Sequence, residues 1–324
     1  MSRQRLIGKK LIRSLLPIAL VVVVFIVAAG GWIVHDITRP LRNPYLVTPQ
    51  SFTQISGPVM KAEDASWRNR DGTQARGWLL RGPAGAPAVV VLHRYGADRS
   101  WLFNFGVKLH EATNFTILWP DLRGHGLDPP VTWSSFGSRE SDDVLAAFDY
   151  LKALKGDKGL PLVGDRLGVY GVELGAYAGM RAAVHDTRVR VLALDSVPRG
   201  PDELMRAALK GKWGIDNRAM QFLTGMAARL YLPRSYDDMQ SCEIAASLRG
   251  RRVLLLSGAD AGYLRDSTAA LARCFQPADV ESATDLPLTG LNLPFTSGEQ
   301  EEGYDRRIIE FFGRVLRPPA EAQP

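Results

Sequence analysis

The chain has 324 residues, of which 46% are hydrophobic and 23% charged, and this composition excludes disordered, collagen-like and disulfide-scaffold proteins. The net charge is +6, but five positive charges precede residue 14 without any acidic residue among them: Arg3, Arg5, Lys9, Lys10 and Arg13. Because only about one net positive charge is left for the rest of the chain, no nucleic-acid partner is expected.

The first predicted element is a transmembrane helix from Leu15 to Val34, which contains twenty residues and no charge. Twenty helical residues match the ~30 Å hydrocarbon core of a bilayer. The basic residues 1–14 favour a cytoplasmic N-terminus, so the folded body is expected in the periplasm or outside the cell. A cleaved signal peptide is the alternative, because Val27–Ala29 resembles a cleavage site. The anchor is favoured because apolar residues continue through Trp32–Val34.

Residues 35–57 are predicted to form a linker, because they are rich in Pro, Thr, Ser and Gln and have no helical periodicity. The folded domain is expected at residues 58–318, followed by a tail at residues 319–324. Its first elements are two predicted strands, Met60–Asn69 and Thr73–Arg81. They are joined by a hairpin that contains Asp-Gly, a strong signal for a tight turn.

Short apolar runs then alternate with amphipathic segments of helix length. Runs rich in Val and Leu without polar alternation are typical of parallel strands that helices bury on both faces. The predicted fold class is therefore α/β, with a mostly parallel sheet flanked by helices such as Arg139–Leu154 and Tyr304–Leu316. Residues 196–250 contain helical pieces but no convincing strand, so they are predicted to form a cap. The predicted strands are Ala88–His93, Phe115–Pro120, Leu167–Tyr170, Val189–Leu194, Val253–Ser257 and Val280–Leu288.

Residues Leu167–Ala176 predict a short strand, a tight turn and the start of a helix rich in small residues. This segment resembles the nucleophile elbow of the α/β-hydrolase superfamily, Gly-x-Ser-x-Gly, in which a strained turn lifts the nucleophile above the sheet. Gly171 and Gly175 match the two glycines of that motif, whereas Glu173 stands in the place of the serine. The glycine spacing is not Gly-x-Gly-x-x-Gly, so no dinucleotide cofactor is expected.

Three other segments support the resemblance, which extends from Pro87 to Leu316. His93-Arg94-Tyr95-Gly96 lies where family members often have His-Gly-x-Gly, the loop that supplies one oxyanion-hole amide. Asp121–Gly126 resembles a turn that is common in esterase-like and peptidase-like members. Asp260 follows a strand at the place where the triad acid is found. The resemblance implies an α/β-hydrolase fold whose oxyanion hole is formed at Tyr95 and Leu174.

The sequence departs from the family in the residues that perform catalysis. In this superfamily the histidine follows the acid and the last strand, but the expected loop, Leu288–Pro294, contains none. His93 is the candidate for a displaced base, and Asp260 is either a vestigial acid or a strand-end cap. Arg94 replaces a family glycine, and we predict that it forms a charge-assisted hydrogen-bonded pair with Glu173. The five histidines are His35, His93, His110, His125 and His185.

Three functions are compatible with these residues. The first is a catalytically degenerate hydrolase-fold protein that acts by binding an unidentified small molecule or protein. The second is an active hydrolase of ester-type or amide-type substrates that uses Glu173 as nucleophile or base, together with His93. The third is a structural role through the cap, residues 196–250. Cys242 and Cys274 form either one disulfide or two inert thiols, and their spacing does not indicate a metal site.

Overall fold

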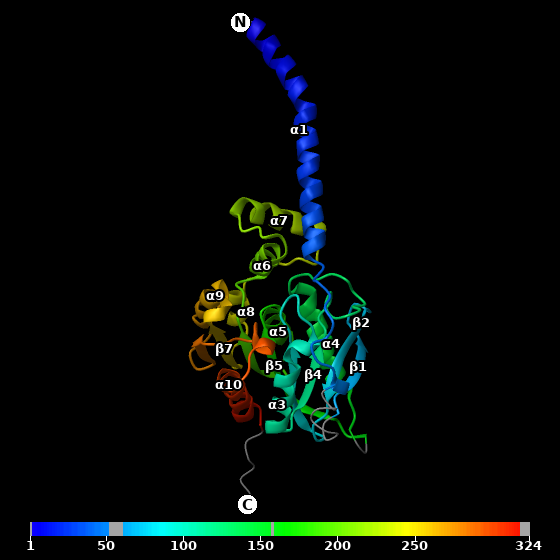
Figure 1. Ribbon diagram of the computed structural model, residues 1–324, viewed down its shortest axis with the longest axis vertical. Helices are drawn as coiled ribbons and strands as arrows, with labels where there is room; N and C mark the ends of the chain where they lie inside the picture. The colour runs from blue at the N-terminus through cyan, green and yellow to red at the C-terminus, as the bar shows by residue number, and fades with distance from the viewer. Residues whose placement is uncertain (1, 52–60, 157–158, 318–324) are drawn as a thin grey trace, which may run out of the picture.

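A single sheet of eight strands forms the centre of the body, in the order β1-β2-β4-β3-β5-β6-β7-β8 (Figure 1). The computed structural model describes residues 2–51, 61–156 and 159–317, with side chains from residue 15 onward. β2 pairs antiparallel with β1 and β4, and all other neighbours pair parallel, which confirms the mostly parallel sheet. The strands are β1 (Glu63–Arg68), β2 (Gln74–Leu80), β3 (Ala86–Leu92), β4 (Thr116–Pro120), β5 (Val163–Val172), β6 (Val189–Asp195), β7 (Arg252–Gly258) and β8 (Val280–Leu286).

Helices cover both faces of the sheet. Successive residues of a strand point to opposite sides, and both sets of side chains are apolar here. On β3, Val89 and Val91 pack into the core beneath α3 and α10, whereas Val90 and Leu92 pack into the core beneath α4 and α5. All four side chains are buried, as the runs of Val and Leu predict. The helices around the sheet are η1 (Arg99–Leu102), α3 (Phe103–Thr113), α4 (Ser138–Ala153), α5 (Leu174–His185), η3 (Ala259–Ala261), α9 (Tyr263–Ala272), η4 (Leu293–Phe295) and α10 (Glu299–Leu316).

The predicted elements of the body are confirmed, with shifts at some of their ends. The hairpin joins β1 to β2 with Arg68 opposite Gln74, although Met60, the first residue of the predicted strand, lies outside the described residues. β5 is longer than the predicted Leu167–Tyr170 at both ends. α10 begins at Glu299 rather than at Tyr304, because its first turn is acidic and acidic side chains stabilise a helix N-terminus.

α1 (Ser2–Ile37) is one continuous helix that projects from the body, and its segment Leu15–Ile37 is long and apolar enough to cross a membrane (Figure 1). The region predicted as a linker, residues 35–57, differs from a free linker in two respects. Its first residues continue α1, and Ile37 is fully buried against the body. Further on, the chain lies along the body, since the Leu46 N–H donates to Ser100 Oγ at 2.9 Å. Residues 52–57 lie outside the described residues.

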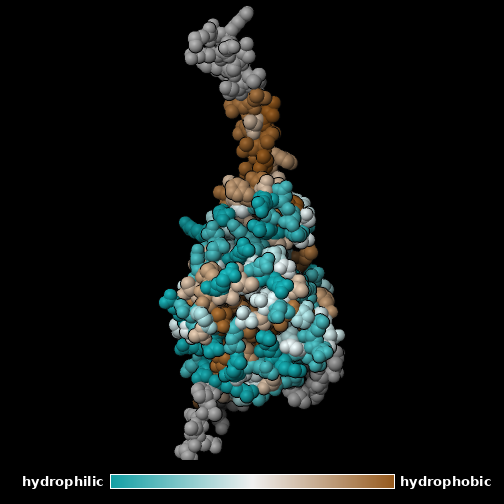
Figure 2. All heavy atoms as spheres, turned by 90° about the vertical axis from the view of Figure 1, so that its left-hand side faces the viewer, coloured by the Kyte–Doolittle hydropathy of each residue, from teal (hydrophilic) through white to brown (hydrophobic). Residues whose placement is uncertain are grey.

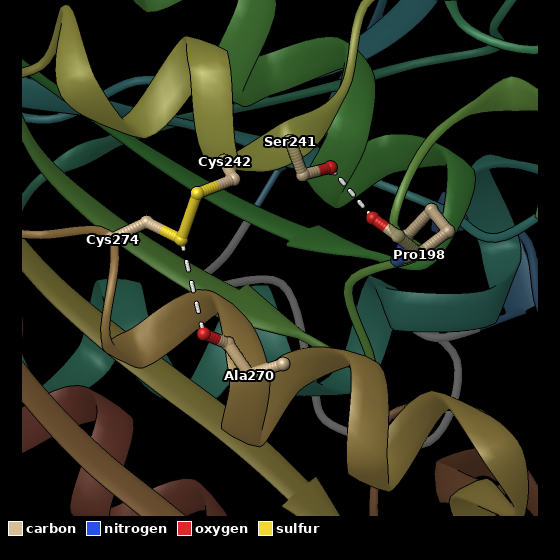
Figure 3. The surroundings of a disulfide bond; sticks show 5 residues. All are labelled: Pro198, Ser241, Cys242, Ala270 and Cys274. Atoms are coloured by element: carbon tan, nitrogen blue, oxygen red, sulfur yellow. Dashed lines mark hydrogen bonds between the residues drawn. A yellow bond between two sulfur atoms is a disulfide. The ribbon is translucent and has the colours of Figure 1, made fainter.

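The cap is helical, as predicted, and consists of α6 (Pro201–Trp213), α7 (Arg218–Tyr231) and α8 (Ser241–Ala246). Figure 1 shows α6 and α7 next to the end of α1 that meets the body. Cys242 and Cys274 form a disulfide that joins α8 to the end of α9 (Figure 3). In the same view, Ser241 Oγ donates to the carbonyl of Pro198 at 2.6 Å, which ties α8 to the start of the cap. The disulfide fixes the C-terminal part of the cap to the body, and the hydrogen bond connects the two ends of the cap.

Candidate functional site at the end of β5

A strained turn places Glu173 at the carboxyl end of β5. The backbone of Glu173 has φ of +50° and ψ of −104°, a conformation that costs a non-glycine residue on the order of 1–3 kcal/mol. The two neighbouring glycines are required by lack of space. A Cβ on Gly171 would lie 2.6 Å from the amide nitrogen of Ala176, and one on Gly175 would collide with the carbonyl group of Leu92. The turn therefore has the shape of a nucleophile elbow, with a carboxylate in the nucleophile position.

The carboxylate of Glu173 binds an amide of the oxyanion loop. Its Oε2 accepts a hydrogen bond of 3.0 Å from the backbone N–H of Tyr95, and the side chain is buried. Tyr95 lies in the loop after β3, which supplies one of the two amides that stabilise the oxyanion in sites of this shape. Leu174, whose amide is the expected second donor, is the first residue of α5. A carboxylate of the protein thus takes a donor that a substrate oxygen would need.

The predicted hydrogen-bonded pair between Arg94 and Glu173 is wrong. Their charged groups do not approach within the 4.0 Å of an ion pair. The Arg94 guanidinium instead stacks on the ring of Trp101, 4.3 Å from its centroid, and donates to the Tyr95 carbonyl at 3.0 Å. Trp101 offers a flat aromatic face, which a guanidinium binds well. Burial raises the pKa of Glu173, and the positive charge of Arg94 opposes that rise only at longer range.

In this structure both ring nitrogens of His93 are bonded to the backbone, so His93 would have to leave one of these partners to act as the displaced base of the second function. Its Nε2 accepts a hydrogen bond of 3.1 Å from the N–H of Leu122, so the proton lies on Nδ1, which bonds the carbonyl of Arg94 at 2.8 Å. Both ring nitrogens are therefore used by the backbone. Burial, together with His125, lowers the pKa of His93 well below its usual value, so the ring stays neutral. His125 itself bonds the carbonyl of Arg123 at 2.8 Å and stabilises its turn.

Asp260 lies directly after β7, at the expected position of the triad acid, but an asparagine and a threonine replace the histidine as its partners. Asp260 Oδ2 accepts hydrogen bonds from Asn292 Nδ2 at 2.9 Å, from Thr289 Oγ1 at 3.0 Å and from Thr289 N–H at 3.2 Å. Both partners belong to the loop after β8, where the family resemblance implies a histidine. The acid therefore keeps its contact with that loop, while the loop presents an amide instead of an imidazole.

Asp195 is a buried carboxylate that the sequence analysis did not assign to the site. It ends β6, next to the elbow strand, and its Oδ2 accepts from the N–H of Gly290 at 2.7 Å and from the hydroxyl of Tyr304. Its Oδ1 accepts from Ser196 Oγ at 2.7 Å. Burial raises the pKa of Asp195 to about 6, although these three donors oppose the rise. The feature of the sequence that could have assigned Asp195 to the site is an acidic residue at the end of a buried strand beside the elbow strand.

The oxyanion loop is also bonded to the end of α1. The hydroxyl of Tyr95 donates to the carbonyl of Ile37, the last residue of that helix, and the Tyr95 ring stacks on Phe136 at 5.6 Å. Burial raises the pKa of Tyr95, so the hydroxyl remains a donor. The residue whose amide binds Glu173 thus connects the candidate site to the N-terminal helix.

The fold matches solved structures of hydrolases, although no family model and no curated protein matches the sequence. An esterase from Pyrococcus furiosus superposes with a TM-score of 0.62 at 19% identity, over 86% of this chain and 100% of its own. The chain has the α/β-hydrolase fold. A Pyrococcus horikoshii acylaminoacyl peptidase matches with a TM-score of 0.61 at 13% identity, over 86% of this chain and 46% of its own. An enol-lactonase from Burkholderia xenovorans matches with a TM-score of 0.53 at 17% identity, over 76% of this chain and 99% of its own.

Identities this low establish a shared fold and do not carry an activity from one protein to another. Within the α/β-hydrolase fold, this chain has Gly171 and Gly175, the Tyr95 amide and Asp260 at the positions expected for the elbow, the oxyanion loop and the acid. It has a carboxylate in the nucleophile position and an asparagine, Asn292, on the acid. Among the residues that the structure describes, no group of three or more His, Cys, Asp or Glu side chains is arranged to hold a metal ion.

Proposed function

We propose that this α/β-hydrolase-fold protein acts by binding a small molecule or another protein and does not hydrolyse esters or amides by the usual triad mechanism. The observation that carries the proposal is the hydrogen bond from the Tyr95 N–H to Glu173 Oε2. A hydrolase lowers its barrier by aiming such an amide at the substrate oxygen on which negative charge develops. Here the amide is already bound by a carboxylate, and a second negative charge beside it would be repelled.

The lack of a free base supports the same proposal. An ester intermediate formed on Glu173 would have to be cleaved by an activated water molecule, and proton transfer by a positioned side chain contributes ~10²–10⁴-fold to such a step. His93 is held by backbone groups at both ring nitrogens, and Asn292 occupies the contact with Asp260. Turnover on Glu173 would therefore stop at the covalent intermediate.

Two observations favour an active hydrolase as the second candidate. The elbow keeps its strained backbone at Glu173, and strain of this kind is stored at functional sites. Burial also raises the pKa of Glu173, which brings the carboxyl group closer to the range in which a general acid or base works. In this candidate mechanism, Glu173 acts on an ester-type or amide-type substrate, and His93 leaves one of its backbone partners to serve as base.

The two candidates differ in the expected effect of Glu173→Gln. Glutamine has the same shape and keeps an oxygen for the Tyr95 amide, so the replacement removes the charge alone. We expect the wild-type full chain in detergent to hydrolyse a panel of chromogenic acyl esters at the background rate, and the variant to give the same initial rates. A fluorophosphonate probe is expected to label neither protein. Substantial hydrolysis by the wild type that is lost in the variant would establish the active hydrolase instead.

We further propose that Leu15–Ile37 anchors the protein in a membrane, with the N-terminus in the cytoplasm and the body in the periplasm or outside the cell. The basic N-terminal residues support this orientation. The disulfide between Cys242 and Cys274 supports an oxidising compartment. Apolar residues continue through Trp32–Val34, beyond the possible cleavage site at Val27–Ala29, and this continuation supports an anchor over a cleaved signal peptide.

The proposed compartment predicts how the two cysteines react in cells. After acid quenching and denaturation, a maleimide reagent is expected to leave Cys242 and Cys274 unmodified unless a reductant is added first, because the disulfide is already closed in the membrane-bound protein. Intact mass measured with and without reductant checks this expectation. Modification of both cysteines without reductant would contradict an oxidising location of the body.

A further inference from the structure

The helix α7 of the cap presents an apolar face to the outside of the protein. Phe222, Met226 and Leu230 follow one another at intervals of four residues and therefore lie on one side of the helix. Phe222 is 68% exposed and Leu230 is 76% exposed. The other side of α7, with Thr224 and Ala228, is buried. An outward-facing apolar side of an amphipathic helix marks a contact with an apolar partner.

α7 lies directly against α1, the helix proposed to cross the membrane. The hydroxyl of Tyr231 is 2.7 Å from Nδ1 of His35, and a Cβ on Gly30 would touch the Cβ of Ala227 at 3.4 Å. Between the two helices is an apolar groove of about 460 Å³, which residues between Phe25 and Ile33 line on the α1 side. One wall of this groove therefore consists of residues of the proposed span.

The position of the contact along α1 indicates what covers this face. A helix rises ~1.5 Å per residue, so Gly30 lies ~6 Å and Phe25 ~14 Å along α1 from Val34, the last residue before His35 and Asp36. Residues of a spanning helix at these positions lie within the hydrocarbon core, which is ~30 Å thick. Side chains that contact them lie among lipid acyl chains. Amphipathic helices on membranes are buried to a comparable depth of ~5–10 Å.

The groups around α7 are those that a membrane interface favours. Trp213, at the end of α6, packs edge-to-face on Trp32 of α1 with 5.1 Å between ring centroids, and tryptophan is enriched at the level of the lipid headgroups. α7 also borders a cavity of about 780 Å³, which Phe222 and Met226 line together with Arg206, Arg218 and Arg229, with Asp202 as the acidic residue among them. Figure 2 shows the apolar surface of α1 continuing into apolar side chains where it meets the body.

We propose that α7 is a second membrane contact. Phe222, Met226 and Leu230 lie among the acyl chains of the leaflet nearest the body, and lipid chains fill the groove between α1 and α7. The proposal rests on the proposed span Leu15–Ile37. Two contacts with the bilayer fix the orientation of the cap, and the arginines beside α7 lie at the level of the lipid phosphates.

The test uses an environment-sensitive fluorophore on a single introduced thiol. Both native cysteines are in the disulfide, so Leu230→Cys in the full chain gives one labelling site. The matched control is Leu160→Cys, which replaces a leucine that is 58% exposed and precedes β5, at the opposite end of that strand from Glu173. Each labelled protein is reconstituted into vesicles of phosphatidylcholine and phosphatidylglycerol, with and without spin-labelled acyl chains that quench fluorescence on contact.

We expect the fluorophore at Leu230→Cys to emit at shorter wavelength in vesicles than after proteolytic release of the body into detergent-free buffer. We also expect this emission to be lost when the acyl chains carry the spin label. Leu160→Cys should show neither change. A Leu230→Cys probe that is not quenched, in a protein that resists alkaline carbonate extraction, would overturn the proposal while leaving the anchor intact. A blue shift that increases with protein concentration and occurs without quenching by the lipid would show that a second copy of the chain covers α7. This result would also overturn the proposal. Release by carbonate, with loss of the N-terminal residues in the intact mass, would contradict the anchor itself.

Discussion

Replacing Glu173 by serine and Asn292 by histidine in the same chain is expected to produce ester hydrolysis that neither replacement produces alone. Serine restores a neutral nucleophile on the strained turn and frees the N–H of Tyr95 from the Glu173 carboxylate. Asn292 is the chosen position because its Nδ2 donates to Asp260 Oδ2 at 2.9 Å. In a triad, the ring N–H of the histidine makes that bond to the acid, which holds the ring in the orientation that accepts the serine proton.

The expected gain follows from the contribution of a general base. The double variant should exceed Glu173→Ser by about 10²-fold or more in kcat/KM, because proton transfer by a positioned histidine is worth ~10²–10⁴-fold. It should also react with a fluorophosphonate at residue 173, which checks the nucleophile independently of turnover. The matched control combines Glu173→Ser with Asn292→Gln, which keeps an amide beside Asp260 and adds no base.

Two results would contradict this expectation. Activity of Glu173→Ser alone at the level of the double variant would show that another group already serves as base. Background activity of a double variant that melts like the wild type would show that residue 292 does not correspond to the catalytic histidine of the fold. Either result would change the interpretation of the loop after β8 without changing the contact between Glu173 and Tyr95.

The fold could be predicted from the sequence because its signals are local. Apolar runs of strand length mark the buried strands, and an Asp-Gly turn marks the hairpin. The elbow at Gly171–Gly175 could also be predicted, because its glycines are required within a stretch of five residues. The spacing of the two glycines is visible in a sequence, although the carbonyl group that requires Gly175 belongs to the distant Leu92.

The contacts within the site could not be predicted, because they depend on side chains far apart in the chain. Arg94 contacts the face of Trp101 instead of Glu173 because of the position of η1 in the fold. The contact between Asp260 and Asn292 requires the loop after β8 to lie over the end of β7. A sequence pattern gives the type of residue at each position, whereas the partner of each polar group follows from the packing of the elements.

Asp195→Asn is expected to stabilise the protein relative to the wild type near neutral pH and to lose most of that advantage in acid. Burial raises the pKa of Asp195 to about 6 in the folded protein, against a usual value of 3.8. A carboxyl group whose pKa is raised in the folded protein makes its full contribution to the stability of the protein below its unfolded-state pKa. That stability is lost as the pH rises through the window between about 3.8 and about 6, because the unfolded state ionises first. Asparagine does not ionise, so the variant avoids this loss.

The side-chain partners of Asp195 allow the amide to replace the carboxylate. Its oxygen can accept from the N–H of Gly290 and the hydroxyl of Tyr304, and its NH₂ group can donate to Ser196 Oγ, which reverses the direction of one bond. Between about pH 4 and about pH 7.5, the free energy of unfolding of the variant should rise relative to the wild type by about 2 kcal/mol. Urea unfolding of the full chain in detergent at both pH values measures this difference, and the titrating groups that do not interact with Asp195 cancel in it. Asp285→Asn, at an exposed aspartate, is the matched control. An advantage of Asp195→Asn that does not change with pH would show that Asp195 is already ionised at low pH, which would require donors stronger than the three that the structure gives it.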